Sequence, residues 1–164
     1  MENILLKARI EKIEKADVIT TEAAVESADW KVLPLTLRDD MVSIIEGEPE
    51  ESEVFSHEND AAEDYDIAGT GMRLTGSFIK ATREQLVDIM DGTKKGSKFA
   101  KSAKLLTLEN AFRITLRNGN VIIIPRAKGA VCTEINVGHG GVSKFPFNFR
   151  LLQASPDWDC TIMW

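Results

Sequence analysis

Residues 112–124 read FRITLRNGNVIII, and this stretch decides the fold class of the chain. Up to Arg117, apolar residues alternate with polar ones, which is typical of a strand with one buried face and one face in water. The Asn118-Gly119 pair that follows tolerates the positive φ angles of a tight turn, and a run of aliphatic residues comes after it. The sequence therefore predicts an antiparallel β-hairpin at this point.

Much of the remaining chain shows the same signals of extended structure. The predicted strands are residues 6–11, 30–37, 41–46, 51–55, 72–79, 105–108, 131–137, 145–151 and 157–164. A helix through Ile13 also fits the first of these stretches, although we prefer the strand. Pro34 cannot donate a hydrogen bond to a neighbouring strand and indicates an edge position or a bulge. Residues 16–29 and 57–70 have no period and read as connections.

One helix is predicted, over residues 82–91. The Thr82 hydroxyl can accept a hydrogen bond from the backbone N–H of Gln85 while the Gln85 side chain reaches back, which is a capping box. Apolar residues follow at helical spacing, and Gly92 is the predicted C-terminal stop. Many strands and one helix predict a mainly β fold: a two-sheet β-sandwich or partly open barrel with one short flanking α-helix and a long hairpin arm.

The composition is that of a single domain spanning residues 1–164. Apolar residues make up 43% of the chain and charged residues 28%, which argues against wholesale disorder. No apolar run approaches the roughly 20 residues that cross a bilayer, and the first residues do not resemble a secretion signal. Because Cys132 and Cys160 are far apart, we expect neither a disulfide framework nor a zinc site, and a reducing cytoplasm suits the chain.

Charge is distributed unevenly along the chain. Residues 39–66 contain no Lys or Arg and twelve acidic residues: Asp39, Asp40, Glu46, Glu48, Glu50, Glu51, Glu53, Glu58, Asp60, Glu63, Asp64 and Asp66. Residues 92–104 form a predicted lysine-rich loop of the opposite sign. An acidic stretch is often only a solvated loop, but a segment of one sign also favours a neighbour of the other. We interpret residues 41–66 as a long acidic hairpin arm, in which Gly47-Glu48-Pro49 breaks the first strand and residues 51–55 return antiparallel to residues 41–46.

The sequence lacks the local signatures of an active site. It contains no G-x-S-x-G, H-E-x-x-H, phosphate-loop or G-x-G-x-x-G motif. The two histidines, His57 and His139, lie in the acidic arm and in a glycine-rich turn, and neither context favours a catalytic base. The acidic arm does not match the spacing of an EF-hand calcium loop. We therefore expect a non-enzymatic protein with no catalytic residue, cofactor or metal.

The order and spacing of several segments resemble one protein family. These segments are Trp30-Lys31-Val32, the strand pair of residues 41–55 with its acidic extension, the strand 72–79 running into residues 81–90 (ATREQLVDIM), residues 121–127 (VIIIPRA), residues 145–154 (FPFNFRLLQA) and Pro156-Asp157. Across most of residues 4–160, they resemble the major tail, or tail tube, proteins of long-tailed bacteriophages and phage-derived particles.

The resemblance implies a sandwich of two sheets flanked by a helix, six subunits to a ring, and rings stacked head to tail into a DNA-conducting tube. One sheet of each subunit would join its neighbours around the lumen, and DNA would pass through without specific binding. The partners would be copies of the chain itself and other tail proteins, namely the tape measure, terminator and baseplate proteins, with no membrane involved. Assembly in the bacterial cytoplasm and a final location in the virion tail of a phage or prophage would follow.

Within such a tube, the arm would reach an adjacent subunit or ring, and we predict that it meets the lysine-rich loop there. The predicted contact residues are Glu46, Glu48, Glu50, Glu51, Glu53, Val54, Phe55, Lys94, Lys95, Lys98, Lys101 and Lys104. Exposed ion pairs contribute only about 0–1 kcal/mol each, so apolar arm residues would supply most of the affinity. The lysine-rich segment 93–104 and the terminal Trp164 depart from the family pattern.

Other functions fit the sequence less well. An inner tube protein of a bacterial secretion system of the type VI kind would look similar at this level. A β-sandwich adhesin or carbohydrate-binding module would need an exposed aromatic platform, for which the tryptophan candidates are Trp30, Trp158 and Trp164. Nucleic-acid binding through the lysine-rich loop would favour interleaved aromatic residues, and only Phe99 is present there.

Overall fold

The computed structural model describes residues 6–164 and is mainly β, with 48% of residues in strands and 7% in helices. The strands are β1 (Ile10–Ala16), β2 (Lys31–Val32), β3 (Leu35–Thr36), β4 (Ser43–Glu46), β5 (Glu50–Phe55), β6 (Ala62–Ala68), β7 (Met72–Ile79), β8 (Gly92–Lys95), β9 (Lys98–Lys101), β10 (Leu108–Leu116), β11 (Val121–Val131) and β12 (Phe145–Leu151). The helices are α1 (Ala24–Ser27) and α2 (Arg83–Ile89). The predicted mainly β class is confirmed.

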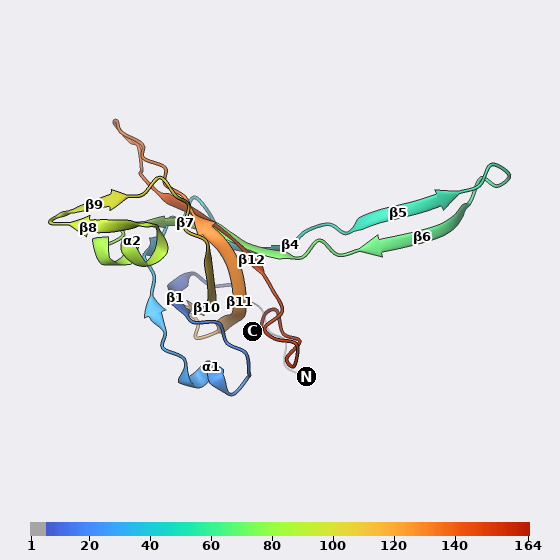
Figure 1. Ribbon diagram of the computed structural model, residues 1–164, viewed down its shortest axis with the longest axis horizontal. Coiled ribbons are helices and arrows are strands. Elements are labelled where there is room, and N and C mark those ends of the chain that lie inside the picture. The colour runs from blue at the N-terminus through green and yellow to red at the C-terminus, as the bar shows by residue number, and fades with distance from the viewer. Residues whose placement is uncertain (1–5) are drawn as a thin grey trace.

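Eight strands form one antiparallel sheet in the order β2-β1-β10-β11-β12-β7-β3, with β4 also paired to β7. The strands at the two ends of this order, β2 and β3, are separated in sequence only by Leu33 and Pro34. Three Cα–Cα steps span at most about 11 Å. The sheet must therefore curl until its two margins approach each other, and it is not a closed barrel (Figure 1). The predicted sandwich fits this arrangement, and Pro34 lies between two edge strands as expected.

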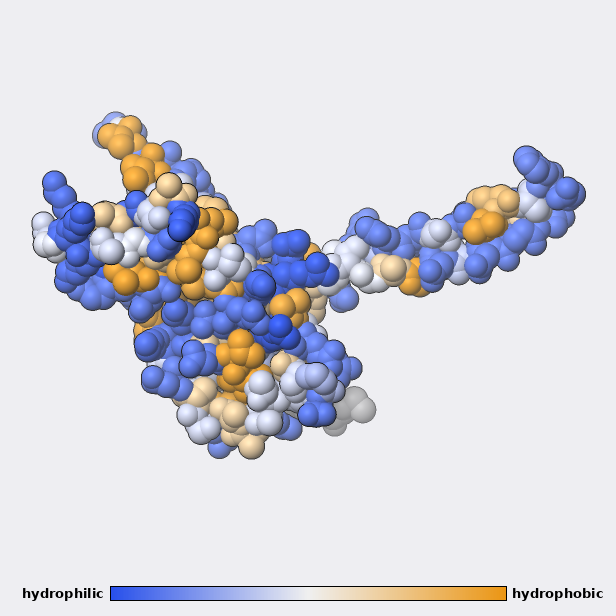
Figure 2. All heavy atoms as spheres, viewed as in Figure 1, coloured by the Kyte–Doolittle hydropathy of each residue, from blue (hydrophilic) through white to orange (hydrophobic). Residues whose placement is uncertain are grey.

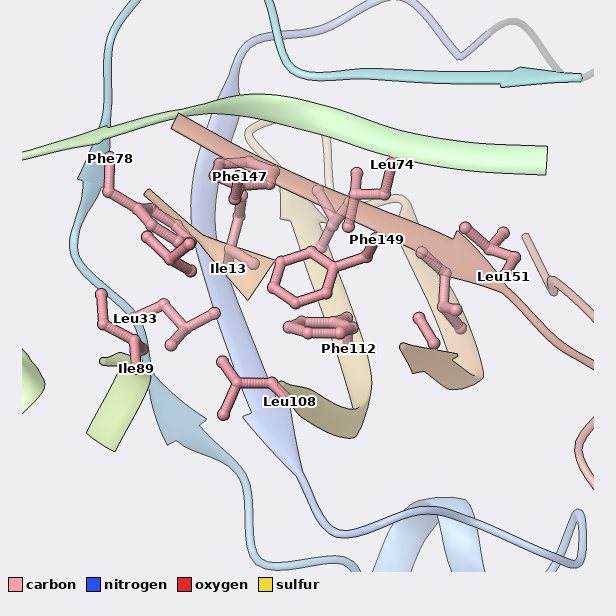
Figure 3. Close-up of a cluster of buried hydrophobic side chains, with 14 of the residues drawn as sticks. Ile13, Leu33, Leu74, Phe78, Ile89, Leu108, Phe112, Phe147, Phe149 and Leu151 are labelled. Atoms are coloured by element: carbon pink, nitrogen blue, oxygen red, sulfur yellow. The ribbon is translucent and has the colours of Figure 1, made fainter. Parts of the chain in front are cut away.

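The core is built from aromatic residues on adjacent strands, enclosed by the curled sheet. Ring centroids lie 4.4 Å apart for Phe78 and Phe147, and 4.6 Å apart for Phe112 and Phe149. Figure 3 shows these side chains converging with aliphatic ones from β1, β7 and α2. Helix α2 contributes Ile89, which is fully buried, and thus flanks the core as predicted.

The hairpin that the sequence predicts around Asn118-Gly119 is present between β10 and β11, and Gly119 has a φ of +89°. Farther along β11, Pro125 lies where a proline would normally interrupt pairing. The register between the two strands shifts at this point, from Asn110↔Ala127 to Phe112↔Ile124, so the irregular ladder needs no donor at Pro125. The Pro125 carbonyl instead accepts a hydrogen bond from the backbone N–H of Ile19 at 3.1 Å.

Helix α2 begins at the predicted capping box. The Thr82 hydroxyl accepts the Gln85 backbone N–H at 3.2 Å, and the Gln85 side-chain oxygen accepts the Thr82 backbone N–H at 3.0 Å. The expected helix stop at Gly92 was wrong, because the helix ends in extended backbone at Met90 and Gly92 has no positive φ. Gly92 begins β8 instead, where a Cβ would lie 2.6 Å from the Phe99 ring.

Several strand boundaries differ from the prediction. The first strand is β1, which starts at Ile10 rather than residue 6. The separate strand predicted at residues 131–137 is wrong, because β11 runs continuously from Val121 to Val131 and residues 132–137 contribute only an isolated bridge at Glu134. Residues 157–164 form only isolated bridges, of which Ile123↔Met163 lies beside β11. An alternating pattern indicates an extended chain but does not show which strand it pairs with. Residues 132–137 and 157–164 are not strands because no neighbouring strand runs continuously beside them.

The acidic arm is paired differently from the prediction. Strand β4 stays in the main sheet against β7, and the chain continues past Gly47–Pro49 into β5, which pairs with β6. The expected return of residues 51–55 against residues 41–46 was wrong, because Gly47–Pro49 interrupts the strand without reversing it. The chain reverses at residues 56–61, and β6 forms within residues 57–70, where the sequence indicated only a connection.

The predicted lysine-rich loop of residues 92–104 is largely a two-stranded ribbon of β8 and β9. Lys95 and Lys98 are the last paired residues, so Gly96 and Ser97 form a two-residue turn. Gly96 has a φ of +59°, which is the requirement at the first position of a type II′ turn. The Gly96-Ser97 pair, which is typical of a two-residue hairpin turn, could have predicted this ribbon from the sequence.

Candidate interaction surfaces

The arm, defined as residues 47–71 with strands β5 and β6, projects from the sheet without touching the body along its length (Figure 1). Every residue of β5 and β6 is exposed. A two-stranded ribbon by itself is marginally stable at best in water. The arm therefore has no core of its own, and a second surface that covers it would stabilise it.

The pairing register gives the arm two faces of different chemistry. Glu53 pairs with Tyr65 and Glu51 with Ile67, so these residues share one face, and strand alternation places Phe55 there too. We call this the mixed face, because carboxylates stand beside apolar side chains on it. The Tyr65 hydroxyl donates a hydrogen bond to Glu51, which raises the pKa of Tyr65. Figure 2 shows the result as hydrophobic groups scattered along an otherwise hydrophilic arm.

The opposite face carries Glu50, Asp64 and Asp66, and the tip is ordered by Glu63. Glu63 accepts hydrogen bonds from Asn59 and from Ser56, both at 2.7 Å, and these bonds hold the pKa of Glu63 below its usual range. Among residues 6–164, no ion pair involves a carboxylate of the arm. The negative charge of the arm is thus uncompensated within the described chain.

The root of the arm is held by backbone contacts between its two strands. The Gly47 backbone N–H donates to the Gly71 carbonyl at 3.2 Å, and the Thr70 hydroxyl donates to the Glu48 carbonyl at 3.1 Å. Gly71 has a φ of +84°, a backbone conformation that residues with a Cβ rarely adopt. These contacts continue the β4–β7 pairing toward the arm and orient it.

The lysines predicted to meet the arm lie at the other end of the molecule (Figure 1). Lys94 forms an ion pair with Glu84 of α2, which lowers the pKa of Glu84. Lys95 and Lys98 face each other across the ribbon, a like-charge pair that disfavours the isolated ribbon. The structure therefore does not bring the predicted contact residues together within one chain, and their contact between chains stays a prediction.

A second group of cations was not predicted from the sequence. Lys128 of β11 lies directly opposite Arg150 of β12, and Arg150 lies opposite Arg73 of β7. We call these three exposed residues the cationic row. Ala127, Phe149 and Leu74, which are their neighbours along the strands, are buried in the core, so the row lies on the outer face. No sequence signal could have found the row, because its members are far apart and only the register aligns them.

A shallow depression of about 620 Å³ lies next to the cationic row. Its lining includes Thr75 and Asn148, two residues along β7 and β12 from the row, together with Met41. At its rim Asp40 accepts hydrogen bonds from Lys144 at 2.5 Å and from Ser77 at 2.7 Å, which lower the pKa of Asp40. None of the side-chain hydrogen bonds in residues 6–164 involves an imidazole, and the Asp40 carboxylate that accepts from Ser77 is also held by Lys144.

Both margins of the curled sheet expose apolar side chains. Val32 and Leu35 are exposed on β2 and β3, and Ile45 is exposed on β4. Strand β2 pairs with β1 only at Glu14 and Lys15, so the beginning of β1 lacks a neighbour on that side among the described residues. Open edges of this kind pair with other strands unless they are covered.

A second projection, residues 133–144, carries apolar side chains into solvent. Val137 is 93% exposed, and Ile135 and Val142 are also exposed. Asn136 orders this loop, because its backbone N–H donates to Ser143 at 3.1 Å and its side chain donates to the Val142 carbonyl at 2.9 Å. An ordered loop whose apolar side chains are exposed is typical of an interaction element.

The tryptophans do not form an exposed platform. Trp30 and Trp158 pack against a small cluster around Ala111, and the Arg113 guanidinium lies 4.7 Å from the centre of the Trp30 ring. Trp164 is the exposed one, at 65%. This arrangement does not favour a carbohydrate-binding face.

Among the described residues, no group of three or more His, Cys, Asp or Glu side chains is placed to hold a metal ion. Within the same range, neither helix has the length and apolar character needed to cross a membrane. No family model matches the chain, and no curated protein matches its sequence.

Proposed function

We propose that this protein is a structural subunit that assembles with copies of itself into stacked hexameric rings, forming a tube of the kind found in bacteriophage and prophage tails. One observation carries this proposal: a folded body extends a long ribbon whose residues are all exposed and whose carboxylates form no ion pair in residues 6–164. Such an arm gains stability only by contact with another surface.

The open margins of the sheet support the same function. A contact between the margin at β1 and β2 of one copy and the margin at β4 of the next would use different surfaces on the two copies. Heterologous contacts of this kind form rings when they close and filaments when they do not. A tube needs both, and apolar residues such as Val32 and Ile45 would be buried at the contact.

The test is the state of the purified protein over a range of concentration and salt. Sedimentation velocity and negative-stain electron microscopy should detect rings with six-fold symmetry and, at high concentration, tubes. A monomer under all conditions would contradict the proposal.

A charge-reversal variant tests the role of the arm. Replacing Glu46, Glu48, Glu50, Glu51 and Glu53 with Lys should leave the body folded, because none of these residues is buried. Assembly should weaken, since the charge of the arm would then oppose the basic surfaces of a neighbour. Unchanged tube formation would exclude electrostatic docking of the arm. An inner tube of a secretion system would behave in the same way, and the neighbouring genes would distinguish the two.

A further inference from the structure

We propose that the cationic row of Lys128, Arg150 and Arg73 is the surface on which the arm of a second copy docks. This inference rests on the proposed function and names the acceptor of the arm, which differs from the lysine-rich ribbon that the sequence suggested.

Within one chain, the row has an energetic cost. Like charges directly opposite each other on adjacent strands destabilise a sheet, and here three stand side by side across β11, β12 and β7. Among residues 6–164, no ion pair involves any of the three. Glu109, which lies opposite Lys128, pairs instead with Arg126 at 2.7 Å. The row therefore presents uncompensated positive charge.

The row is also held rigidly. It lies on strands that are paired on both sides, and each member has a neighbour along its strand that is buried in the core: Ala127, Phe149 or Leu74. The lysine-rich ribbon, in contrast, is two-stranded, and Lys94 already has a partner in Glu84. A rigid acceptor loses less conformational entropy on binding than a mobile one.

The row and the mixed face of the arm match in charge and in spacing. Three cations on adjacent strands span roughly 10 Å at a strand spacing of about 4.8 Å, and alternate residues on a strand are about 6.7 Å apart. Glu51 and Glu53 can therefore both reach guanidinium groups of the row. The depression beside the row lies on the same face and has room for an aromatic side chain of the arm such as Phe55 or Tyr65.

The arm of the same chain leaves the row open. Arg73 lies one residue beyond the start of β7, next to the root of the arm, and the arm extends away from the sheet (Figure 1). A second copy can therefore dock its arm on the row while the arm of the first copy remains free. The contact is heterologous and propagates from copy to copy.

The test uses two charge-reversed variants of the full chain. The row variant carries Arg73→Glu and Arg150→Glu, and the arm variant carries Glu51→Arg and Glu53→Arg. All four positions are exposed, so each monomer should stay folded, and the row variant should unfold at a temperature no lower than the wild type because Arg150→Glu gives Lys128 a neighbour of opposite charge. Each variant alone should need a protein concentration at least about tenfold higher for half-maximal assembly in sedimentation velocity, as expected when several charge pairs become repulsive.

Rescue provides the decisive measurement. An equal mixture of the two variants restores opposite charges at every contact, as does one chain that carries all four substitutions, so both should assemble nearly as the wild type does. The matched control carries Lys95→Glu and Lys98→Glu and should assemble like the wild type.

Three results would overturn the inference while leaving the proposed function intact. These are wild-type assembly by the row variant, failure of the mixture to recover, or rescue of the arm variant by the Lys95 and Lys98 control instead. Loss of binding to a single-stranded DNA oligonucleotide by the row variant, with assembly unchanged, would likewise assign the row to a polyanion rather than to the arm. A wild-type chain that never assembles would overturn both proposals.

Discussion

The body and the arm of this protein use the same secondary structure under opposite conditions. In the body, β12 alternates between exposed side chains and side chains that are at most a few per cent exposed, and β7 and β10 each bury several side chains. In the arm, β5 and β6 contain no buried residue. Strand pairing alone therefore does not explain where stability resides: burial stabilises the body, whereas the arm depends on its attachment and on what covers it.

The largest expected effect of a single change is in the aromatic core. Phe149→Ala removes a ring that is 1% exposed and packs against Phe112 and Phe147. We expect a loss of about 3–5 kcal/mol in the free energy of unfolding, measured by chemical denaturation. The matched control in the arm, Phe55→Ala, should change the free energy of unfolding of the monomer by less than about 0.5 kcal/mol. Similar losses at the two sites would contradict the contrast between body and arm.

A smaller loss is expected at Gly129, where β11 passes close to β12. A Cβ at this position would lie 1.9 Å from the Asn148 carbonyl oxygen and 2.7 Å from the Phe149 Cα. Because both are backbone atoms, Gly129→Ala should force the strands apart and cost about 1–3 kcal/mol. Gly69→Ala in the arm, where a Cβ would meet nothing within 4 Å, is the control and should be nearly neutral. Chemical denaturation of both variants tests the difference.

The next loss in the free energy of unfolding is expected at Glu14, a buried charged residue of the body. Glu14 is 4% exposed and accepts two hydrogen bonds from Arg113 Nη2, each at 2.9 Å. Glu14→Gln removes the charge at nearly constant volume and should cost about 2 kcal/mol, since hydrogen bonds to charged groups contribute more than neutral ones. The control is Glu109→Gln, which breaks a more exposed pair with Arg126 and should cost less than about 1 kcal/mol. Equal costs at the two positions would show that burial of Glu14 contributes nothing extra.

The same pair makes stability depend on pH. Burial alone would raise the pKa of the Glu14 carboxyl, but Arg113 and Lys12 outweigh it, and the pKa lies below its ordinary value of 4.5. A pKa lower in the folded than in the unfolded chain means that this contribution is complete above the unfolded value and is lost as the pH falls through the folded one. The difference in unfolding free energy between wild type and Glu14→Gln should therefore shrink as the pH is lowered below about 4.5. A difference that stays constant down to pH 3 would contradict this assignment.

Deletion of the arm should have the smallest effect on folding. Replacing residues 48–70 with an Asn-Gly turn would join β4 directly to β7, whose pairing already reaches Glu46↔Met72. We expect the free energy of unfolding of the monomer to change by less than about 1 kcal/mol, because the removed strands bury nothing. Assembly should be lost in sedimentation velocity. Cooperative unfolding that requires the arm would contradict the division between the two regions.

Local chemistry in the sequence predicted the elements whose cause is local. The capping box at Thr82, the Asn118-Gly119 turn and the alternation of residues 145–151 depend on neighbours within a few positions, and the structure has all three. The two-stranded ribbon at residues 92–101 was missed, although Gly96 carried its turn signal. The charge segregation identified the arm as an unusual segment but assigned its pairing incorrectly.

The sequence by itself determined the mainly β class, the short helix and the concentration of acidic residues in one segment, because period, capping and charge are properties of neighbouring residues. Only the tertiary structure decided that β2 and β3 lie at opposite margins of one curled sheet, that β5 pairs with β6, and that Lys128, Arg150 and Arg73 form a row. These features depend on the register between strands far apart in the chain. Register is set by how the whole set of buried side chains packs together, and a local pattern contains no information about it.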